Sequence, residues 1–390
     1  MIEDKLAKRI RQLPPYLFAD LDRRREAVRA RGVDIIDLGV GDPDRPTPSH
    51  IVEAMQREVA SAKNHRYPSY QGLPAFREAV AHWYKQRFGV SLDPKTEVLS
   101  LIGAKEGIAH FPLAFVNPGD LTLVPSPAYP VYKIGTIFCG GKPHVMSLKQ
   151  KNGFLPDLDK IPRKTADRAK VMYLNYPNNP TGAVADRAFF EKAVAFAKKH
   201  NIIIAHDAPY SEMYYDDNDR PMSFLEVPGA RDVGIEFHSL SKTYQMTGWR
   251  IGFAVGNARI IAALGTVKTN IDSGLFEATQ RAGIVALTGD QKCTDEMRAI
   301  YRERRDALVG GLKEAGIKVA PPKATFYVFA PTPGRKPSAE FCGEILEKTG
   351  VVTTPGVGFG KEGEGFFRCA LTVPVERIKE AVRRIKSLEI

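Results

Sequence analysis

Between Ile51 and Leu287 the sequence alternates short apolar runs, rich in β-branched residues, with longer amphipathic stretches. Runs of this length fit single strands, and the stretches between them fit helices that cross back over a sheet. The alternation is typical of an α/β domain with a mostly parallel central sheet flanked by helices. The expected strands are Glu97–Ile102, Leu121–Val124, Val171–Asn175, Ile202–His206, Ile235–Ser239 and Ile251–Val255. The expected helices are Ser49–Ser61, Pro74–Phe88, Lys105–Val116, Arg187–His200 and Ala258–Thr269.

The pattern changes from about Asp290 onward. A long charged helix is expected through Glu314, and shorter strands and helices follow it, which indicates a smaller α+β domain. A chain of 390 residues also exceeds the size at which a single core usually stops growing. We therefore expect a large domain of residues 46–288 and a small domain of residues 1–45 and 289–390.

The composition excludes several classes of protein. The formal charge of +11 comes from basic residues interleaved with acidic ones, without a basic arm of the kind that binds nucleic acid. The N-terminus is charged from the start, and no apolar run is long enough to span a membrane. The four cysteines are scattered without metal-ligand spacing, so we expect reduced thiols, no metal site and a cytoplasmic location.

One segment carries the strongest chemical signal. Lys242 follows an expected strand, has Ser239 and Ser241 beside it, and precedes Arg250. A desolvated lysine close to another cation has a lowered pKa, which frees its amine to attack a carbonyl group. The planar guanidinium of Arg250 and the two hydroxyls are suited to a phosphate. The segment predicts a nucleophilic lysine next to an anion site.

Two further motifs precede this lysine in the chain. Tyr173–Gly182 contains the turn Asn-Asn-Pro-Thr-Gly, and His206–Tyr210 reads His-Asp-Ala-Pro-Tyr at the end of an expected strand. Together with the lysine segment, they resemble the signatures of the class I and II aminotransferases of fold type I, which use pyridoxal 5'-phosphate (PLP).

The resemblance implies that PLP is attached covalently to Lys242, with Ser239, Ser241 and Arg250 among its contacts. Asp207 would bond the pyridinium nitrogen, and Tyr210 and Asn179 would bond the phenolic oxygen. A carboxylate beside the ring nitrogen keeps that nitrogen protonated, so that the ring accepts electrons from the substrate. Lys242, Asp207 and Tyr210 are the expected catalytic residues.

The family's phosphate loop and stacking aromatic also have counterparts. Gly103-Ala104-Lys105-Glu106-Gly107 lies between an expected strand and an expected helix, where backbone N–H groups receive an anion. Ala104 and Lys105 are therefore assigned to the cofactor. Tyr129 falls where the family stacks an aromatic ring on the pyridine ring.

The resemblance assigns substrate contacts near both ends of the chain. Arg368, in the apolar strand that begins at Phe366, would bind the α-carboxylate with both arms of its guanidinium. Asp37–Pro43, which contains Gly41, resembles the segment whose backbone lies against the substrate. Tyr16 and Lys105 are candidates for the distal end of the substrate, and Tyr129 and Asn179 are further substrate contacts.

A shared active site is implied by Tyr67, which matches a tyrosine that reaches the phosphate of the neighbouring subunit. This implies a homodimer, the commonest closed symmetry. Residues 270–273 are further candidates for contacts with the partner. Where plant-type members have an acidic residue near the partner tyrosine, this chain has Tyr70 and Gln71.

Within the family, the chain is most similar to bacterial LL-diaminopimelate aminotransferases. The phrases Leu13–Phe18, Asn64–Tyr70, Glu236–Tyr244 and Gly358–Gly365 carry this closer match. Such enzymes form LL-diaminopimelate from tetrahydrodipicolinate and glutamate, in lysine and cell-wall synthesis. Two alternatives are an aminotransferase of the aspartate or alanine type and a PLP-dependent C–S lyase. A transcription regulator would need a DNA-binding module, for which the segment before Asp37 is too short.

Overall fold

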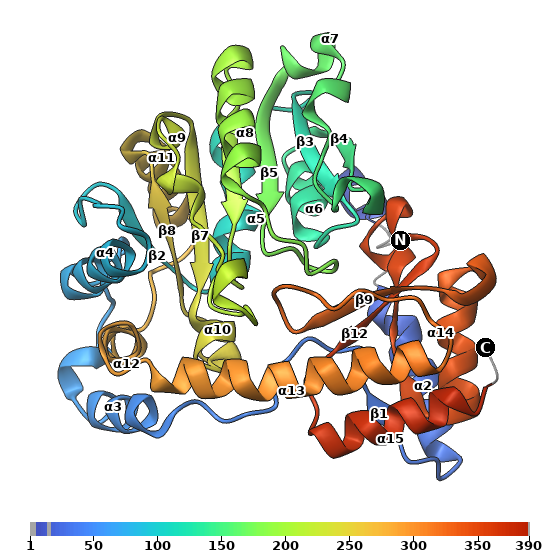
Figure 1. Cartoon of the computed structure of the whole chain (residues 1–390). Helices are drawn as coiled ribbons and strands as arrows, with labels where there is room; N and C mark the ends of the chain where they lie inside the picture. The colour runs from blue at the N-terminus through green and yellow to red at the C-terminus, as the bar shows by residue number, and fades with distance from the viewer. Residues whose placement is uncertain (1–4, 14–16, 389–390) are drawn as a thin grey trace.

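The computed structural model describes residues 5–13 and 17–388. Its largest sheet has seven strands in the order β2-β8-β7-β6-β5-β3-β4 (Figure 1). Strand β8 runs antiparallel to both of its neighbours, and every other neighbouring pair is parallel, so the predicted mostly parallel sheet is confirmed. The strands are β2 (Val98–Leu101), β3 (Leu121–Ser126), β4 (Lys142–Ser147), β5 (Ala169–Asn175), β6 (Ile203–Asp207), β7 (Gly234–Ser239) and β8 (Gly252–Gly256).

Helices cover both faces of this sheet, and each face has its own apolar core. On one face the core includes α3 (Ser49–Val59), α4 (Pro74–Phe88), α8 (Arg187–His200) and α12 (Glu277–Thr288). On the other face it includes α5 (Ala104–Phe115), α6 (Val131–Phe138) and α11 (Ala258–Thr269). The short helices of this part are α7 (Arg163–Ala166), α9 (Ala230–Val233) and α10 (Leu240–Thr243). A sheet buried on both faces explains why its strands are apolar throughout rather than alternating.

The helix ends follow from local sequence signals. Helix α4 starts with Pro74, whose missing N–H costs nothing in the first turn, and stops at Gly89 in the left-handed conformation. Helix α8 is capped by the Asp186 side chain, which accepts a hydrogen bond from the backbone N–H of Phe189. Helices α4, α8 and α11 have the bounds that the sequence predicts.

A second body contains the residues near both ends of the chain (Figure 1). Its antiparallel sheet has the order β11-β12-β9, and β1 pairs with β10 in a parallel ladder that joins Ile36 to Val351. The strands are β1 (Ile36–Asp37), β9 (Tyr327–Pro331), β10 (Val351–Val352), β11 (Thr354–Pro355) and β12 (Phe366–Ala370). The helices are α2 (Leu17–Ala30), α13 (Lys292–Glu314), α14 (Ser338–Thr349) and α15 (Val375–Lys386). Helix α1 (Lys8–Arg11) lies instead against the large sheet's helices, since Arg9 donates a hydrogen bond to the Phe138 carbonyl oxygen of α6.

The core of this second body includes residues from distant parts of the sequence. Ile36 and Leu38 from the N-terminal segment are buried with Phe326 and Phe367 from the C-terminal part. Tyr210 belongs to the same core, although it follows β6 of the large sheet. The loop after Asp207 therefore packs against the second body. The boundaries at residues 46 and 289 stay a prediction.

Several elements differ from the sequence prediction. The remaining predicted strands and helices agree within two residues, but β4, α6 and α12 were not among them. Strand β4 lies at the edge of the sheet and pairs only with β3, and its side chains are mostly exposed or half-buried. An edge strand of this kind lacks the apolar run on which the prediction depends. Within the described residues, no helix combines the length and apolar character needed to cross a membrane.

Candidate active site

The predicted site residues gather where the parallel strands end. Asp207 closes β6, Ser239 closes β7, and the turn with Asn179 follows β5. Ligands of open α/β sheets bind at the carboxyl ends of the strands, because the loops there and the N-termini of the following helices surround one crevice. The second body closes this crevice with Arg368 of β12 and with the segment that contains Gly41.

Lys242 lies in α10, directly after β7. Its Nζ donates a hydrogen bond to the Gly41 carbonyl oxygen at 3.0 Å and lies 5.6 Å from the ring centroid of Phe326. Burial, together with the positive charges of Arg250 and Arg368, lowers the pKa of Lys242 to about 8, although Asp42 acts in the opposite direction. At pH 7 roughly a tenth of this amine is then unprotonated, far more than at the ordinary lysine pKa of 10.5, and the unprotonated amine is the form that acts as a nucleophile.

Asp207 is 5% exposed, and its two carboxylate oxygens have different surroundings. Oδ2 accepts a hydrogen bond from the Tyr132 hydroxyl at 2.7 Å, whereas Oδ1 is buried with no hydrogen-bond partner among the described residues. Burial raises the pKa of Asp207 to about 6, and the hydrogen bond from Tyr132 opposes this rise. A buried carboxylate with one free oxygen needs a cationic donor to be stable as an anion.

A cradle for an anion lies at the N-terminus of α5. Gly103 precedes this helix with φ +79°, and no side chain caps the free N–H groups that start at Ala104. A Cβ on Gly103 would collide with the guanidinium of Arg250, so the glycine lets Arg250 lie against the helix N-terminus. Ser239 and Ser241 sit at the start of α10 beside this point, and the Ser241 N–H donates to Ser239 Oγ. Free N–H groups, hydroxyls and a guanidinium match a phosphate group.

Arg368 is 3% exposed and has no carboxylate partner among the described residues. Its guanidinium donates to Asn179 Oδ1 at 2.9 Å and to the Gly39 carbonyl at 2.7 Å, and its Nε is buried without a partner. It lies 4.2 Å from the ring centroid of Tyr327. A buried guanidinium without a counter-ion is costly, and its planar fork could hold a carboxylate.

Two tyrosine hydroxyls meet across the crevice. Tyr210 and Tyr327 lie 3.2 Å apart between their hydroxyl oxygens, one from the loop after β6 and one from β9. Burial raises the pKa of Tyr210 well above its usual value, so its hydroxyl is a donor at neutral pH. A Cβ at Gly41 would overlap the Tyr327 side chain, which explains why glycine is required at this position.

Tyr129 and Lys105 lie together at the edge of the crevice. Lys105 Nζ lies 5.9 Å from the ring centroid of Tyr129, whose ring meets Tyr132 edge-on at 6.3 Å between centroids. The Lys105 side chain is exposed, so it is free to reach a ligand. Tyr16, predicted as a second distal contact, lies outside the described residues.

Tyr67 does not join the other residues within one chain. Its side chain is 87% exposed, on the loop that precedes α4. Two further residues of the site, Tyr132 and Tyr327, were not predicted from the sequence. Tyr132 is the second residue of α6, a helix that was not predicted. Nothing in the local sequence marks Tyr327, because its role depends on the approach of β9 to β6.

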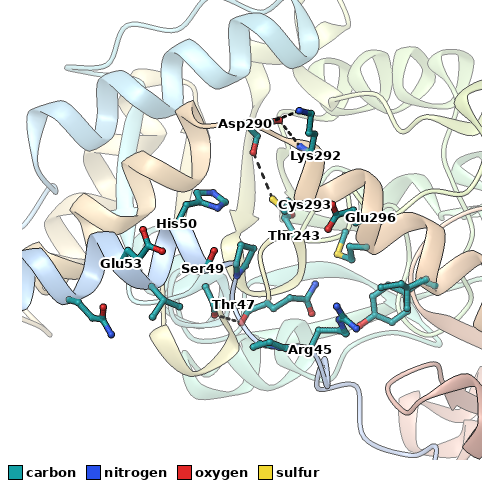
Figure 2. A pocket seen from close by; sticks show the side chains of 18 residues that line it. Arg45, Thr47, Ser49, His50, Glu53, Thr243, Asp290, Lys292, Cys293 and Glu296 are labelled. Atoms are coloured by element: carbon teal, nitrogen blue, oxygen red, sulfur yellow. Dashed lines mark hydrogen bonds and ion pairs between the residues drawn. The ribbon is translucent and has the colours of Figure 1, made fainter.

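A cavity of about 680 Å³ lies next to this site but is not part of it (Figure 2). Neither Lys242 nor Asp207 lines it, whereas Thr243 and Gln245, which follow Lys242, do. The Thr47 hydroxyl donates to the Gln245 carbonyl at 2.8 Å, which ties the segment before α3 to this turn. Other residues of its lining are His50, Asp290, Cys293 and Glu296. The cavity therefore lies behind the turn that follows the lysine.

Comparison with known proteins agrees with this geometry. Residues 33–385 match the family described as aminotransferase class I and II, and the chain belongs to this family. Two similar curated proteins are both named LL-diaminopimelate aminotransferase. One, from Nitratidesulfovibrio vulgaris, is 61% identical over 100% of both chains. The other, from Syntrophobacter fumaroxidans, is 59% identical over 98% of both chains.

The fold is also that of a solved structure described as a probable N-succinyldiaminopimelate aminotransferase from Thermus thermophilus. The TM-score is 0.90 at 38% sequence identity, and the match covers 95% of this chain and 99% of that one. The α/β fold of the fold-type I aminotransferases is thus confirmed for this chain.

Proposed function

We propose that this chain is an LL-diaminopimelate aminotransferase that holds PLP through Lys242. The observation that carries the chemistry is the meeting of four incomplete groups in one crevice. These are a deprotonatable lysine, a buried carboxylate with a free oxygen, an open helix N-terminus beside an arginine, and a buried arginine without a carboxylate. The relatives at 59% and 61% identity support the specific substrate.

The four incomplete groups fit PLP. Asp207 Oδ1 would accept a hydrogen bond from the protonated ring nitrogen, and Tyr129 would stack on the ring. Tyr210 and Asn179 would contact the phenolic oxygen. Ala104, Lys105, Ser239, Ser241 and Arg250 would surround the phosphate, with Tyr67 supplied by a partner subunit. When bound, PLP supplies a ring that accepts electrons from the substrate Cα.

The substrate would be held by its α-carboxylate on Arg368, with the backbone at Gly41 alongside. Hydrogen bonds to Asn179 Oδ1 and to the Gly39 carbonyl oxygen already fix the position of the guanidinium. With PLP and substrate bound, the Lys242 Nζ would take the proton from the substrate Cα as a general base. The same Nζ then returns the proton as a general acid. Glutamate first donates its amino group, and the second substrate receives it, so the kinetics should be ping-pong.

A panel of amino donors tests the specific substrate. Purified, PLP-loaded protein is mixed in turn with LL-diaminopimelate, its meso isomer, glutamate, aspartate and alanine, and the cofactor spectrum is followed. We expect LL-diaminopimelate and glutamate to convert the cofactor. Conversion by aspartate or alanine but not by LL-diaminopimelate would assign the chain to those types instead. Release of pyruvate and ammonia without an oxo-acid acceptor would indicate a C–S lyase.

A homodimer with shared active sites is part of the proposal. Two loops carry large exposed apolar side chains. The loop before α4 has Tyr67 and Tyr70, and the loop after α11 has Ile271 and Phe276. The two loops touch, because a Cβ on Gly274 would lie 2.9 Å from the Ser69 carbonyl oxygen. Exposed apolar side chains that gather on one surface mark an interface. A second copy of the chain would cover them and receive Tyr67.

Mixing two inactive variants tests this sharing. Tyr67→Ala and Lys242→Ala are each expected to impair activity as homodimers, the first by weakening cofactor binding. After unfolding and refolding together, the mixed dimers should contain one site with Lys242 from one chain and Tyr67 from the other. Activity in the mixture should therefore exceed the sum of the two separate proteins. A mixture no more active than that sum, with dimer exchange verified by mass spectrometry, would contradict shared sites.

A further inference from the structure

A buried polar cluster lies directly behind the candidate active site and has no part in the chemistry above. It is centred on Glu236 of β7, which is fully buried and pairs in register with His206 of β6. Successive residues of a strand point to opposite faces, so His206 faces away from the crevice while Asp207 faces into it. Their partners confirm this: His206 packs against Phe190 and Phe224, whereas Asp207 bonds Tyr132.

The Glu236 carboxylate is surrounded by donors. The described residues form no ion pair with it except the two histidines. Burial raises the pKa of Glu236, but hydrogen bonds from His206 and His238 outweigh this and hold it below its usual value. The donors are the His206 and His238 rings, the Tyr84 and Ser223 hydroxyls and the Phe224 backbone N–H. Glu236 is therefore an anion that can only accept hydrogen bonds.

The two contacts of the His206 ring fix its tautomer. Nδ1 lies 2.8 Å from Glu236 Oε2, and Nε2 lies 3.3 Å from the backbone N of Tyr176. A carboxylate only accepts and a backbone N–H only donates, so the proton belongs on Nδ1 and the lone pair on Nε2. Protonation of Nε2 would set two donors against each other and leave the N–H of the buried Tyr176 without a partner.

Tyr176 belongs to the turn that carries Asn179. The Asn175 side chain ties the same turn to β6, since its Nδ2 donates to the Asp207 carbonyl at 2.8 Å and its Oδ1 accepts from the Asn179 N–H at 2.9 Å. Asn179 in turn accepts from Arg368. Two sets of hydrogen bonds therefore hold the turn to the end of β6. One is made by the His206 ring and the other by the Asn175 side chain.

We propose that His206 is a positioning residue, which as the Nδ1–H tautomer holds the turn with Asn179 in place beside Asp207. Glu236 fixes that tautomer from behind. The inference rests on the proposed function for the roles of Asp207 and Asn179. The tautomer itself follows from hydrogen bonds that no substrate touches.

The first test measures the tautomer in the PLP-loaded wild-type protein. Histidine is labelled with ¹⁵N, and a two-bond ¹⁵N–¹H correlation spectrum shows which ring nitrogen carries the proton; His206→Gln assigns the signal among the eight histidines. We expect a protonated Nδ1 and an unprotonated Nε2 at pH 7. A proton on Nε2 would overturn the inference. Because this spectrum needs no substrate, a wrong substrate assignment would leave its outcome unchanged.

The second test separates the two contacts of the ring. In His206→Asn the amide N–H takes the place of Nδ1–H and keeps the hydrogen bond to Glu236. In His206→Gln the longer side chain puts an amide oxygen in the place of Nε2 and keeps an acceptor for the Tyr176 N–H. We expect kcat per PLP-loaded site to be about tenfold or more lower in H206N than in H206Q, with a raised KM for glutamate, because small misplacements of binding groups are costly.

His238→Asn is the matched control. His238 also bonds Glu236, at 2.7 Å, and is 3% exposed, but within the described part of the chain it makes no hydrogen bond to the turn. Loss of the His238 ring should lower the melting temperature of the H238N protein without lowering kcat per PLP-loaded site. Equal kcat values in H206N, H206Q and H238N would show that the cluster only supports the fold. If H206N did not fold, the wild-type tautomer would decide alone.

Discussion

Replacing Lys242 with alanine is expected to reduce turnover of every amino donor by about 10²- to 10⁴-fold, the range for loss of a general acid/base. The fold should persist, because Lys242 is only partly buried and its one hydrogen bond goes to the Gly41 carbonyl. Turnover is followed with glutamate and 2-oxo-acid acceptors at saturating PLP. Lys242→Ala protein that turned over at the wild-type rate would refute the assignment.

Lys242→Arg is the control that keeps the positive charge but cannot act as a base. We expect it to be as inactive as Lys242→Ala. The pH dependence adds a second measurement. Since the pKa of Lys242 is about 8 without ligand, reaction of the cofactor-free protein with PLP should speed up as pH rises and level off above about 8. A midpoint near 10.5, the ordinary value for lysine, would mean that the buried, cationic surroundings are absent in solution.

Asp207→Asn is expected to separate activity from stability. It removes the negative charge that would keep the cofactor ring protonated, so activity should fall by about 10²- to 10³-fold, as when one electrostatic contact in an active site is lost. The cofactor-free protein should become more stable. Its carboxyl has a pKa of about 6 in the folded state against 3.8 in the unfolded chain, because burial penalises the charge.

These two pKa values determine how the stability of the folded protein changes with pH. Between about pH 4 and pH 6 the unfolded chain has lost the Asp207 proton and the folded protein has not, so stability falls as pH rises through this window. Above it the charge costs about 3 kcal/mol, because each pKa unit corresponds to about 1.4 kcal/mol. Urea unfolding of the cofactor-free proteins at pH 7 should therefore show Asp207→Asn as the more stable by up to that amount.

At about pH 3 the difference between the two proteins that arises from this charge should vanish, since the carboxyl is then neutral in both the folded protein and the unfolded chain. Tyr132→Phe is a useful second variant, because it removes the hydrogen bond that the Asp207 carboxylate accepts and leaves the charge. We expect it to raise the pKa of Asp207 further and to weaken PLP binding less than Asp207→Asn does. An Asp207→Asn protein less stable than the wild type at pH 7 would contradict the account of a costly buried charge.

Much of the candidate site could be predicted because its chemistry is local in sequence. Lys242 with its serines and Arg250 lies within one strand–helix segment, and the N-terminus of α5 is one turn after a strand. Asp207 ends one buried strand, and Asn179 lies in the turn that follows another. Parallel strands bring such ends to one edge of a sheet, so an α/β alternation with polar residues at strand ends already places them together.

Contacts between the two bodies could not be predicted in this way. Tyr327 meets Tyr210, and Arg368 meets Asn179, across sequence separations of 117 and 189 residues. The exposure of Tyr67 could not be predicted either. A tyrosine in a loop can pack within its own chain or reach a second chain, and the local sequence does not distinguish the two.

By itself, the sequence determined the α/β class, the order of the main strands and helices, and the choice of candidate reacting groups. These depend on hydrophobic period and on residue types within short segments. The tertiary structure alone decided that Asp207 has one free oxygen, that Arg368 is buried without a carboxylate, and that His206 is held as one tautomer by Glu236 and Tyr176. The reason is that burial and the count of hydrogen-bond partners arise only when distant segments pack together, and these two quantities set the charges that the chemistry uses.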